Sequence, residues 1–168
     1  QWAKHLGATV IGTVGSPDKA ELAQSHGCDH PILYREGDFV SRVKEITKGR
    51  GVDAVYDSIG ETTFMKSLDC LRPMGIIVSF GQASGPIPPM DISILAAKGS
   101  LFLDRPRLMA YTAERQDLLA HVKDLFEGVT KGAVKIEIHQ TYLLAEAAQA
   151  HRDLEGRKTT GSAVLIIE

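Results

Sequence analysis

The stretch VDAVYDSIGETTFMKSLDCLRPMGIIVSFG, residues 52–81, decides the fold class of this chain. It begins with the apolar run VDAVY, continues with Phe64 and Leu68 at helical spacing, and ends in the apolar run GIIVSFG at 75–81. Two strands joined by a helix of about ten residues form a parallel pair, because a parallel connection must cross over the sheet. The stretch therefore predicts a βαβ unit.

The same alternation extends along the whole chain. It predicts an α/β fold with a doubly wound parallel sheet of the Rossmann type, covered by helices on both faces. Further strands are expected at 8–14, 30–34, 100–104, 135–142 and 162–168, and helices at 17–26, 39–47, 62–71, 93–99, 114–130 and 145–156.

Composition narrows the classes of function. The 168 residues are 43% hydrophobic and 24% charged, with a net charge of −2, as in an ordinary globular domain. This charge gives no reason to expect nucleic acid or a membrane surface as a partner. Cys28 and Cys70 form no CxxC pair, so neither a disulfide nor a zinc site is expected. Free cysteines are typical of the reducing cytoplasm, and a cytoplasmic location is expected. No apolar run reaches the roughly 18 residues of a membrane span.

The turn GTVGSPDK, residues 12–19, carries the most informative side chains. Nucleotide-binding sheets usually place an acid at such a turn, for a ribose hydroxyl. Here Gly15 leaves room for a 2′-phosphate, Ser16 offers a hydroxyl, and Lys19 offers charge one helical turn later. An alternative interpretation is that Ser16 and Pro17 only begin a helix and that Lys19 is solvated.

Three other strand ends are candidates for a ligand site. Tyr34 either contacts a nucleotide or is a half-buried strand residue. The turns that contain Ser58 and Phe80–Gly81 offer glycines where a flat ring would approach the backbone. Arg157 precedes the last strand and, on the sequence alone, is typical of a solvated turn. No metal-ligand spacing and no nucleophile turn is present, so no catalytic residue is expected.

Two segments carry a resemblance to a known family. GTVGSPDKAELAQSHGCDHPILYRE (12–36) and VYDSIGETTFMKSLDCLRPMGIIVSFGQASG (55–85) resemble the quinone oxidoreductase, zeta-crystallin-like branch of the zinc-independent medium-chain dehydrogenases/reductases. The resemblance implies a Rossmann domain at 1–134 that binds NADPH and lacks its first strand and pyrophosphate turn. It also implies that the tail, 135–168, normally belongs to a catalytic domain.

The resemblance implies hydride transfer from NADPH to quinones or related electrophilic alkenes and carbonyls. The cofactor carries this chemistry, so no catalytic acid or base is assigned. A homodimer formed through the edge strand near Leu101–Asp104 is also implied. The resemblance also implies three groups of cofactor contacts. The 2′-phosphate pocket is formed by Gly15, Ser16, Lys19, Tyr34 and Arg157. Ser58 lies on the adenosine side, and Phe80 and Gly81 lie beside the nicotinamide half.

Other functions stay open at this point. An enoyl-thioester reductase of the same family would differ mainly in its substrate pocket. A Rossmann-like methyltransferase would share strand ends such as DAVYD but requires an acid where Gly15 and Ser16 stand. A non-catalytic binding module would keep the fold without the chemistry. The 168-residue chain alone is expected to bind NADPH weakly and to show no turnover.

Overall fold

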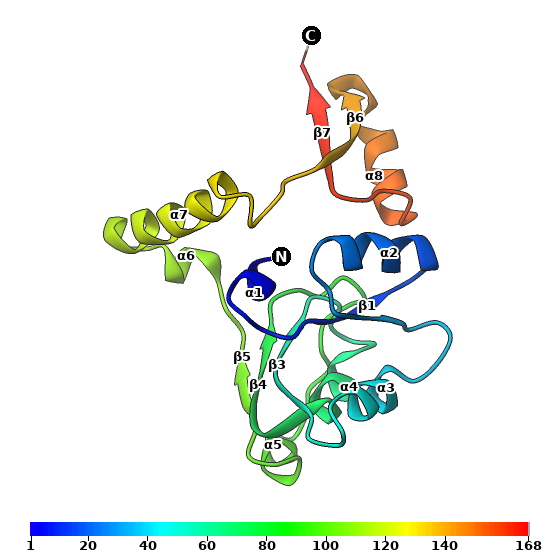
Figure 1. Ribbon diagram of the computed structural model, residues 1–168, viewed down its shortest axis with the longest axis vertical. Helices are drawn as coiled ribbons and strands as arrows, with labels where there is room; N and C mark the ends of the chain where they lie inside the picture. The colour runs from blue at the N-terminus through cyan, green and yellow to red at the C-terminus, as the bar shows by residue number, and fades with distance from the viewer. Residues whose placement is uncertain (168) are drawn as a thin grey trace.

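The computed structural model describes residues 1–167 and confirms an α/β architecture (Figure 1). Every strand pairing in it is parallel. The elements in chain order are α1 (Trp2–His5), β1 (Ile11–Val14), α2 (Pro17–Ser25), β2 (His30–Leu33), α3 (Phe39–Ile46), β3 (Val52–Asp57), α4 (Phe64–Asp69), β4 (Leu71–Ser79), α5 (Ser93–Ala97), β5 (Phe102–Asp104), α6 (Leu108–Tyr111), α7 (Arg115–Thr130), β6 (Ile138–Leu143), a 3₁₀ turn (Leu144–Glu146), α8 (Ala147–Glu155) and β7 (Ser162–Ile166).

The described strands form three separate hydrogen-bonded sheets, β1–β2, β3–β4–β5 and, in the tail, β6–β7. Within residues 1–167, no ladder of hydrogen bonds joins β1 to β3. In the Rossmann strand order 3-2-1-4-5-6, the first strand lies between the strands that correspond to β1 and β3. The break therefore falls where a sheet that lacks its first strand should be divided.

Two small apolar clusters form the core around the β1–β2 and β3–β4–β5 sheets. One lies on the β3–β4–β5 piece and consists of Phe64, Leu68, Leu71, Ile77 and Leu101. The other joins β2 and α3 to β3 and is built on Ile32, Val40, Val43 and Cys70, with Ile11, Val52 and Val55 packed against it. Side-chain packing thus connects β1–β2 with β3 where strand hydrogen bonds do not.

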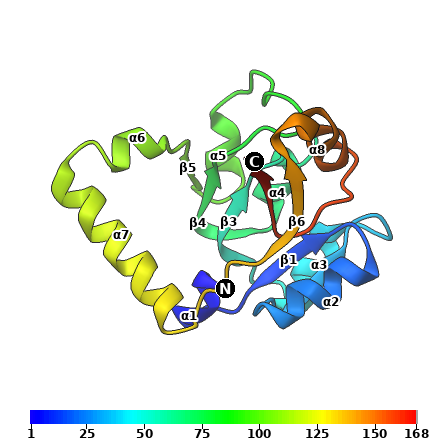
Figure 2. The same cartoon turned by 90° about the horizontal axis from the view of Figure 1, so that it is seen from above.

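Two segments extend away from this body (Figures 1 and 2). The tail, from Lys135 onward, forms β6, α8 and β7 beyond α2, whereas α7 lies on the other side of the N-terminal residues. The apolar stripe of α7 is largely exposed, with Phe126 at 62%. At Gly128 a Cβ would lie 2.6 Å from Cζ3 of Trp2, so the glycine allows the indole of α1 to approach α7.

The structure corrects several boundaries. The first strand begins at Ile11 and not at residue 8, and the strand expected from 135 begins at Ile138. The helix expected to end near Pro73 ends at Asp69, and Pro73 lies inside β4. The β3–β4 register shifts between Val52 and Ala54, and such an irregularity accommodates a residue with no N–H. The short helix α6 was not expected at all.

Candidate functional site

The ends of β1 and β2 bring together residues that are far apart in the sequence. Nη1 of Arg157 donates to Oη of Tyr34 at 2.6 Å, and Nζ of Lys19 donates to the carbonyl oxygen of Arg157 at 3.0 Å. A Cβ on Gly15 would lie 3.3 Å from Oη of Tyr34, so the glycine lets the phenol approach the turn after β1. Gly15, Lys19, Tyr34 and Arg157, with the adjacent Ser16, are called the β1/β2 cluster below.

Ser16 lies at the N-cap of α2, but its side chain does not cap the helix. Its backbone is extended, with φ −155°, and its hydroxyl makes no capping hydrogen bond. Pro17 occupies the first helical position, where its fixed φ suits the helix and its missing N–H has no cost. The helix therefore starts without the Ser16 hydroxyl, which leaves this group available as a donor.

The β1/β2 cluster is rich in donors and cationic groups. Within residues 1–167, neither Lys19 nor Arg157 has a carboxylate within 4.0 Å. The N-terminus of α2 adds partial positive charge at the same turn. No acid stands at Gly15 or Ser16, and the acid of this turn, Asp18, forms no ion pair with Lys19 or Arg157. An ammonium group, a guanidinium group and two hydroxyls around that position suit an anionic ligand such as a phosphate.

The ends of β3 and β4 form a second group of candidate residues. A Cβ on Gly81 would lie 2.5 Å from the carbonyl oxygen of Ser58, so only glycine allows the two turns to touch there. The amide of Ala83 donates to the same oxygen at 3.1 Å, and the amide of Phe80 donates to the carbonyl oxygen of Asp57 at 3.0 Å. The ring of Phe80 remains 54% exposed. We call these contacts the β3/β4 turns.

The buried carboxylate of Asp57 accepts hydrogen bonds from the turn that follows β3 and from α4. It is only 4% exposed and accepts from the amides of Ile59 (2.8 Å) and Gly60 (3.0 Å) and from the hydroxyls of Thr63 (2.8 Å) and Ser67 (2.8 Å). Burial alone would raise the pKa of the Asp57 carboxyl, but these hydrogen bonds outweigh it and hold the pKa below its ordinary value. Asp57 is thus a buried acceptor with a structural role.

Arg105 is a residue that sequence reasoning missed. Its Nη1 donates to the carbonyl oxygens of Ser79 (2.7 Å) and Gly81 (3.1 Å), on either side of Phe80. The guanidinium group therefore fixes the backbone that presents the exposed ring. The only feature of the sequence that could have indicated this role is the position of Arg105 directly after the strand expected at 100–104.

Neither group resembles a metal site or a nucleophile. Among the residues that the structure describes, no three His, Cys, Asp or Glu side chains are grouped to hold a metal ion. Burial raises the pKa of the Cys70 thiol to about 12, so the reactive thiolate is scarce at neutral pH.

No helix within residues 1–167 is long and apolar enough to cross a membrane.

Comparison with known proteins identifies the family of this chain. Residues 1–124 match the family described as zinc-binding dehydrogenase. The quinone oxidoreductase of Pseudomonas aeruginosa is 48% identical over 99% of this chain and 51% of its own length. The 2-haloacrylate reductase of Burkholderia sp. is 49% identical over 98% of this chain and 50% of its own length.

Solved structures give the same result. The crystal structure of Escherichia coli quinone oxidoreductase complexed with NADPH has a TM-score of 0.93 and 44% identity, over 98% of this chain and 52% of that one. The chain thus spans about half the length of the relatives it matches. It belongs to the medium-chain dehydrogenase/reductase family, described as zinc-binding dehydrogenases, and is similar to the quinone oxidoreductases of that family over essentially its whole length.

Proposed function

We propose that this chain is the cofactor-binding portion of an NADPH-dependent quinone oxidoreductase. The convergence of Lys19, Tyr34 and Arg157 beside Gly15 and Ser16, where no acid stands at the strand end, carries the proposal. A 2′-phosphate distinguishes NADPH from NADH, and the β1/β2 cluster offers it two positive charges and two hydroxyls. The complex of the E. coli relative with NADPH supports the same cofactor.

Each residue of the β1/β2 cluster has a physical role in this proposal. Gly15 keeps the turn open, because a side chain there would crowd the Tyr34 phenol. Ser16 and Tyr34 donate hydroxyl hydrogens to phosphate oxygens. Lys19 and Arg157 supply charge, and their charge-assisted hydrogen bonds are worth about 1.5–3 kcal/mol each. Even one such contact would favour NADPH over NADH by at least about tenfold.

The β3/β4 turns serve the remainder of the cofactor in this proposal. Ser58 lies on the adenosine side, and Phe80 and Gly81 lie beside the nicotinamide half. The bound NADPH would supply the hydride that reduces the substrate. The residues of this chain bind and orient the cofactor, and none of them is assigned the role of acid or base.

The proposed substrates are quinones and related electrophilic alkenes or carbonyls. Similarity to the Pseudomonas quinone oxidoreductase supports the first class. Similarity to a 2-haloacrylate reductase favours a second candidate, the reduction of activated alkenes, which an enoyl-thioester reductase also performs. A methyltransferase would require an acid at the turn occupied by Gly15 and Ser16, and the family match does not favour it.

We also propose a homodimer formed through β5 and a cytoplasmic location. Among the strands of residues 1–167, β5 pairs with β4 alone, and its Phe102 (56%) and Leu103 (41%) are exposed. The free thiols of Cys28 and Cys70 suit a reducing compartment. Light scattering tests the dimer: Phe102→Glu should halve the measured mass, and an unchanged mass would rule out this interface.

The decisive experiment restores the family length. The chain is joined to the N-terminal half of the E. coli quinone oxidoreductase, and oxidation of NADPH or NADH by 1,4-benzoquinone is followed. NADPH should be at least about tenfold more effective in kcat/KM, and Lys19→Ala should remove most of this preference. Equal use of NADH by a folded fusion would contradict the proposal. If the fusion does not fold, binding of 2′,5′-ADP by the chain itself provides the test.

A further inference from the structure

Arg157 meets the β1/β2 cluster through two different parts of the residue. Its guanidinium group donates to Oη of Tyr34, and its backbone carbonyl oxygen accepts from Nζ of Lys19. Both contacts hold only while the peptide and the side chain of Arg157 keep one orientation. The backbone conformation of Arg157 is therefore part of the site.

That backbone conformation is unusual for an arginine. Its φ is +57°, in the left-handed region that disfavours a residue with a Cβ. The amide of Arg157 donates to the carbonyl oxygen of Leu154 at 3.0 Å. The next amide, of Lys158, donates to the carbonyl oxygen of Asp153 at 2.9 Å. Helices often end with this pair of hydrogen bonds, and glycine usually occupies the left-handed position. Here Gly156 stands one residue earlier, at φ −71°, and the strained position carries a guanidinium group.

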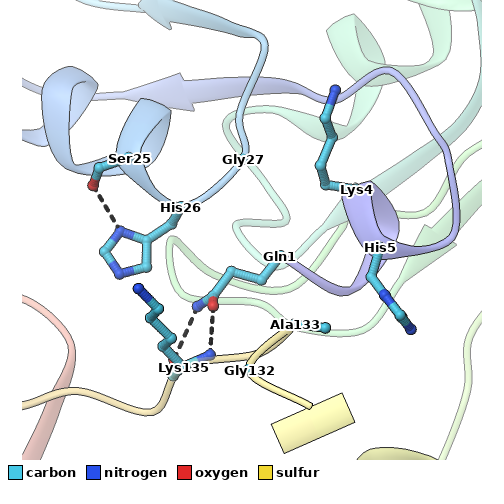
Figure 3. Close-up of a pocket in the computed structure, with 9 residues that line it drawn as sticks. All are labelled: Gln1, Lys4, His5, Ser25, His26, Gly27, Gly132, Ala133 and Lys135. Carbon is cyan, nitrogen blue, oxygen red and sulfur yellow. Dashed lines mark hydrogen bonds between the residues drawn. The ribbon is translucent and has the colours of Figure 1, made fainter.

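The nucleotide-binding part of the chain holds the tail at few other points. The side-chain amide of Gln1 exchanges two hydrogen bonds with the backbone of Lys135, at 2.6 and 3.0 Å (Figure 3). Nε2 of His26 lies 3.1 Å from the carboxylate of Glu137. Within residues 1–167, no further hydrogen bond or ion pair between side chains of the two parts involves the segment 153–158. The orientation of this segment must therefore come largely from the tail itself.

The side chain of Asp153 ties the end of α8 to β6, which lies beside it (Figure 1). Its carboxylate accepts from the hydroxyl of Tyr142 on β6 at 3.2 Å and from the amide of Gln149 at 3.0 Å. It also contacts Nζ of Lys158, the residue directly after Arg157, at 3.3 Å. The Asp153 side chain is only 18% exposed, although no residue of α8 is fully buried. Apolar packing therefore holds the end of α8 weakly, and the Asp153 carboxylate supplies contacts that orient it.

We propose that Asp153 is a positioning residue that holds Arg157 in its left-handed conformation and so directs the guanidinium group to the 2′-phosphate site. The inference rests on the proposed function and adds a residue that determines its cofactor specificity. The carboxylate of Asp153 accepts no hydrogen bond from the β1/β2 cluster. As an anion, it would by itself disfavour a phosphate nearby. A loss of phosphate affinity on its removal therefore reports the placement of Arg157.

The test compares two probes that differ by the 2′-phosphate, 2′,5′-ADP and 5′-ADP. Calorimetric titration of the chain gives both affinities for Asp153→Ala, for Arg157→Ala and for the variant with both changes. Glu155→Ala is the matched control, since Glu155 is an exposed acid of the same helix whose side chain has no hydrogen bond or ion pair to another described residue. The control removes the same charge from nearly the same place.

Asp153→Ala should lower the affinity for 2′,5′-ADP by about three- to tenfold and leave that for 5′-ADP unchanged, because it weakens the charge-assisted contact of Arg157 with the phosphate. When Arg157→Ala is already present, Asp153→Ala should have no further effect. Glu155→Ala should lower neither affinity. An equal loss for the two nucleotides, or the same loss in the Arg157→Ala background, would overturn the inference, since a merely structural role would not depend on Arg157.

A second variant, Tyr142→Phe, keeps the test decisive if Asp153→Ala does not fold. It removes the hydroxyl that reaches Asp153 and retains the ring, and it should lower the affinity for 2′,5′-ADP by about two- to threefold. An unchanged affinity would overturn the inference. If the unmodified chain does not prefer 2′,5′-ADP over 5′-ADP, the proposed function fails and the inference fails with it. A preference that Asp153→Ala leaves intact contradicts the inference alone.

Discussion

The β1/β2 cluster and the β3/β4 turns lie at the ends of neighbouring parts of one fold, but they are built differently. The β1/β2 cluster relies on the charged side chains of Lys19, which is half-buried, and of Arg157, which is exposed and 123 residues from Tyr34 in the sequence. The β3/β4 turns rely on backbone contacts, two closely spaced glycine-dependent turns and a buried carboxylate. The β1/β2 cluster would bind a ligand through charged groups, and the β3/β4 turns would bind it through a closely packed backbone surface.

This difference predicts that mutations will separate binding from stability. Side chains of the β1/β2 cluster contact few other residues, so their loss should lower cofactor selectivity and leave folding nearly unchanged. The β3/β4 turns interlock with the core, so changes there should destabilise the fold first. The predictions below test this separation in order of expected effect.

Gly81→Ala should have the largest effect. The new Cβ would lie 2.5 Å from the carbonyl oxygen and 2.8 Å from Cα of Ser58, both backbone atoms that cannot move independently. We expect the free energy of unfolding to fall by about 3 kcal/mol, measured by urea denaturation. Gly37→Ala is the control, because nothing lies within 4 Å of a Cβ there. Equal stability of the two variants would contradict the claim that the β3/β4 turns are important for the stability of the fold.

Asp57→Asn should follow, with a loss of about 1–2 kcal/mol at pH 7. Because the folded-state pKa of Asp57 is lowered, its carboxylate stabilises the fold above the ordinary aspartate value of 3.8, and this stabilisation is lost as the pH falls through the lower folded value. The difference between the two proteins should therefore shrink in acid. Melting temperatures from pH 7 to pH 3 measure it, and a constant difference would show that charge is not involved.

Lys19→Ala should change selectivity and leave stability intact. Loss of one charge-assisted contact predicts a fall of about tenfold or more in the affinity for 2′,5′-ADP, with no change for 5′-ADP. Calorimetric titration gives both values. Lys44→Ala removes an equal charge from an exposed position on α3 and should leave both affinities unaltered. An equal loss for the two nucleotides would mean that Lys19 does not recognise the 2′-phosphate.

Tyr34→Phe should give the smallest effect, a fall of about two- to tenfold in the same affinity. The variant removes one hydroxyl, which contacts Arg157, and retains the ring. Unfolding and 2′,5′-ADP titration are measured on the same sample. A large loss of stability would indicate that the phenol is part of the core and would remove the contrast between the two regions.

The sequence predicted which candidate residues lie at strand ends, because that placement depends on local order. Gly15, Ser16 and Lys19 follow a recognisable strand, and Ser58, Phe80 and Gly81 follow two more, so parallel pairing alone places them at strand ends. Arg157 was different, because its own surroundings are typical of a solvated turn. Only the resemblance suggested its contact with the β1/β2 cluster.

Other features could not be predicted because they depend on contacts across the fold. Pro73 signals the end of a helix in sequence, yet the shift in β3–β4 register places it inside a strand. Arg105 acts through carbonyl oxygens more than twenty residues away, which no spacing rule reveals. An apolar helix stripe ordinarily packs against a core, but within residues 1–167 too little packs against that of α7 to bury it.

The central claim is that the β1/β2 cluster recognises a 2′-phosphate, and binding of 2′-AMP against 5′-AMP tests it most directly. These nucleotides differ only in the position of the phosphate and need no other part of the cofactor site. The account predicts that the chain binds 2′-AMP at least about tenfold more tightly, and that Lys19→Ala combined with Arg157→Ala abolishes the difference. Equal affinities in the unmodified chain would contradict it.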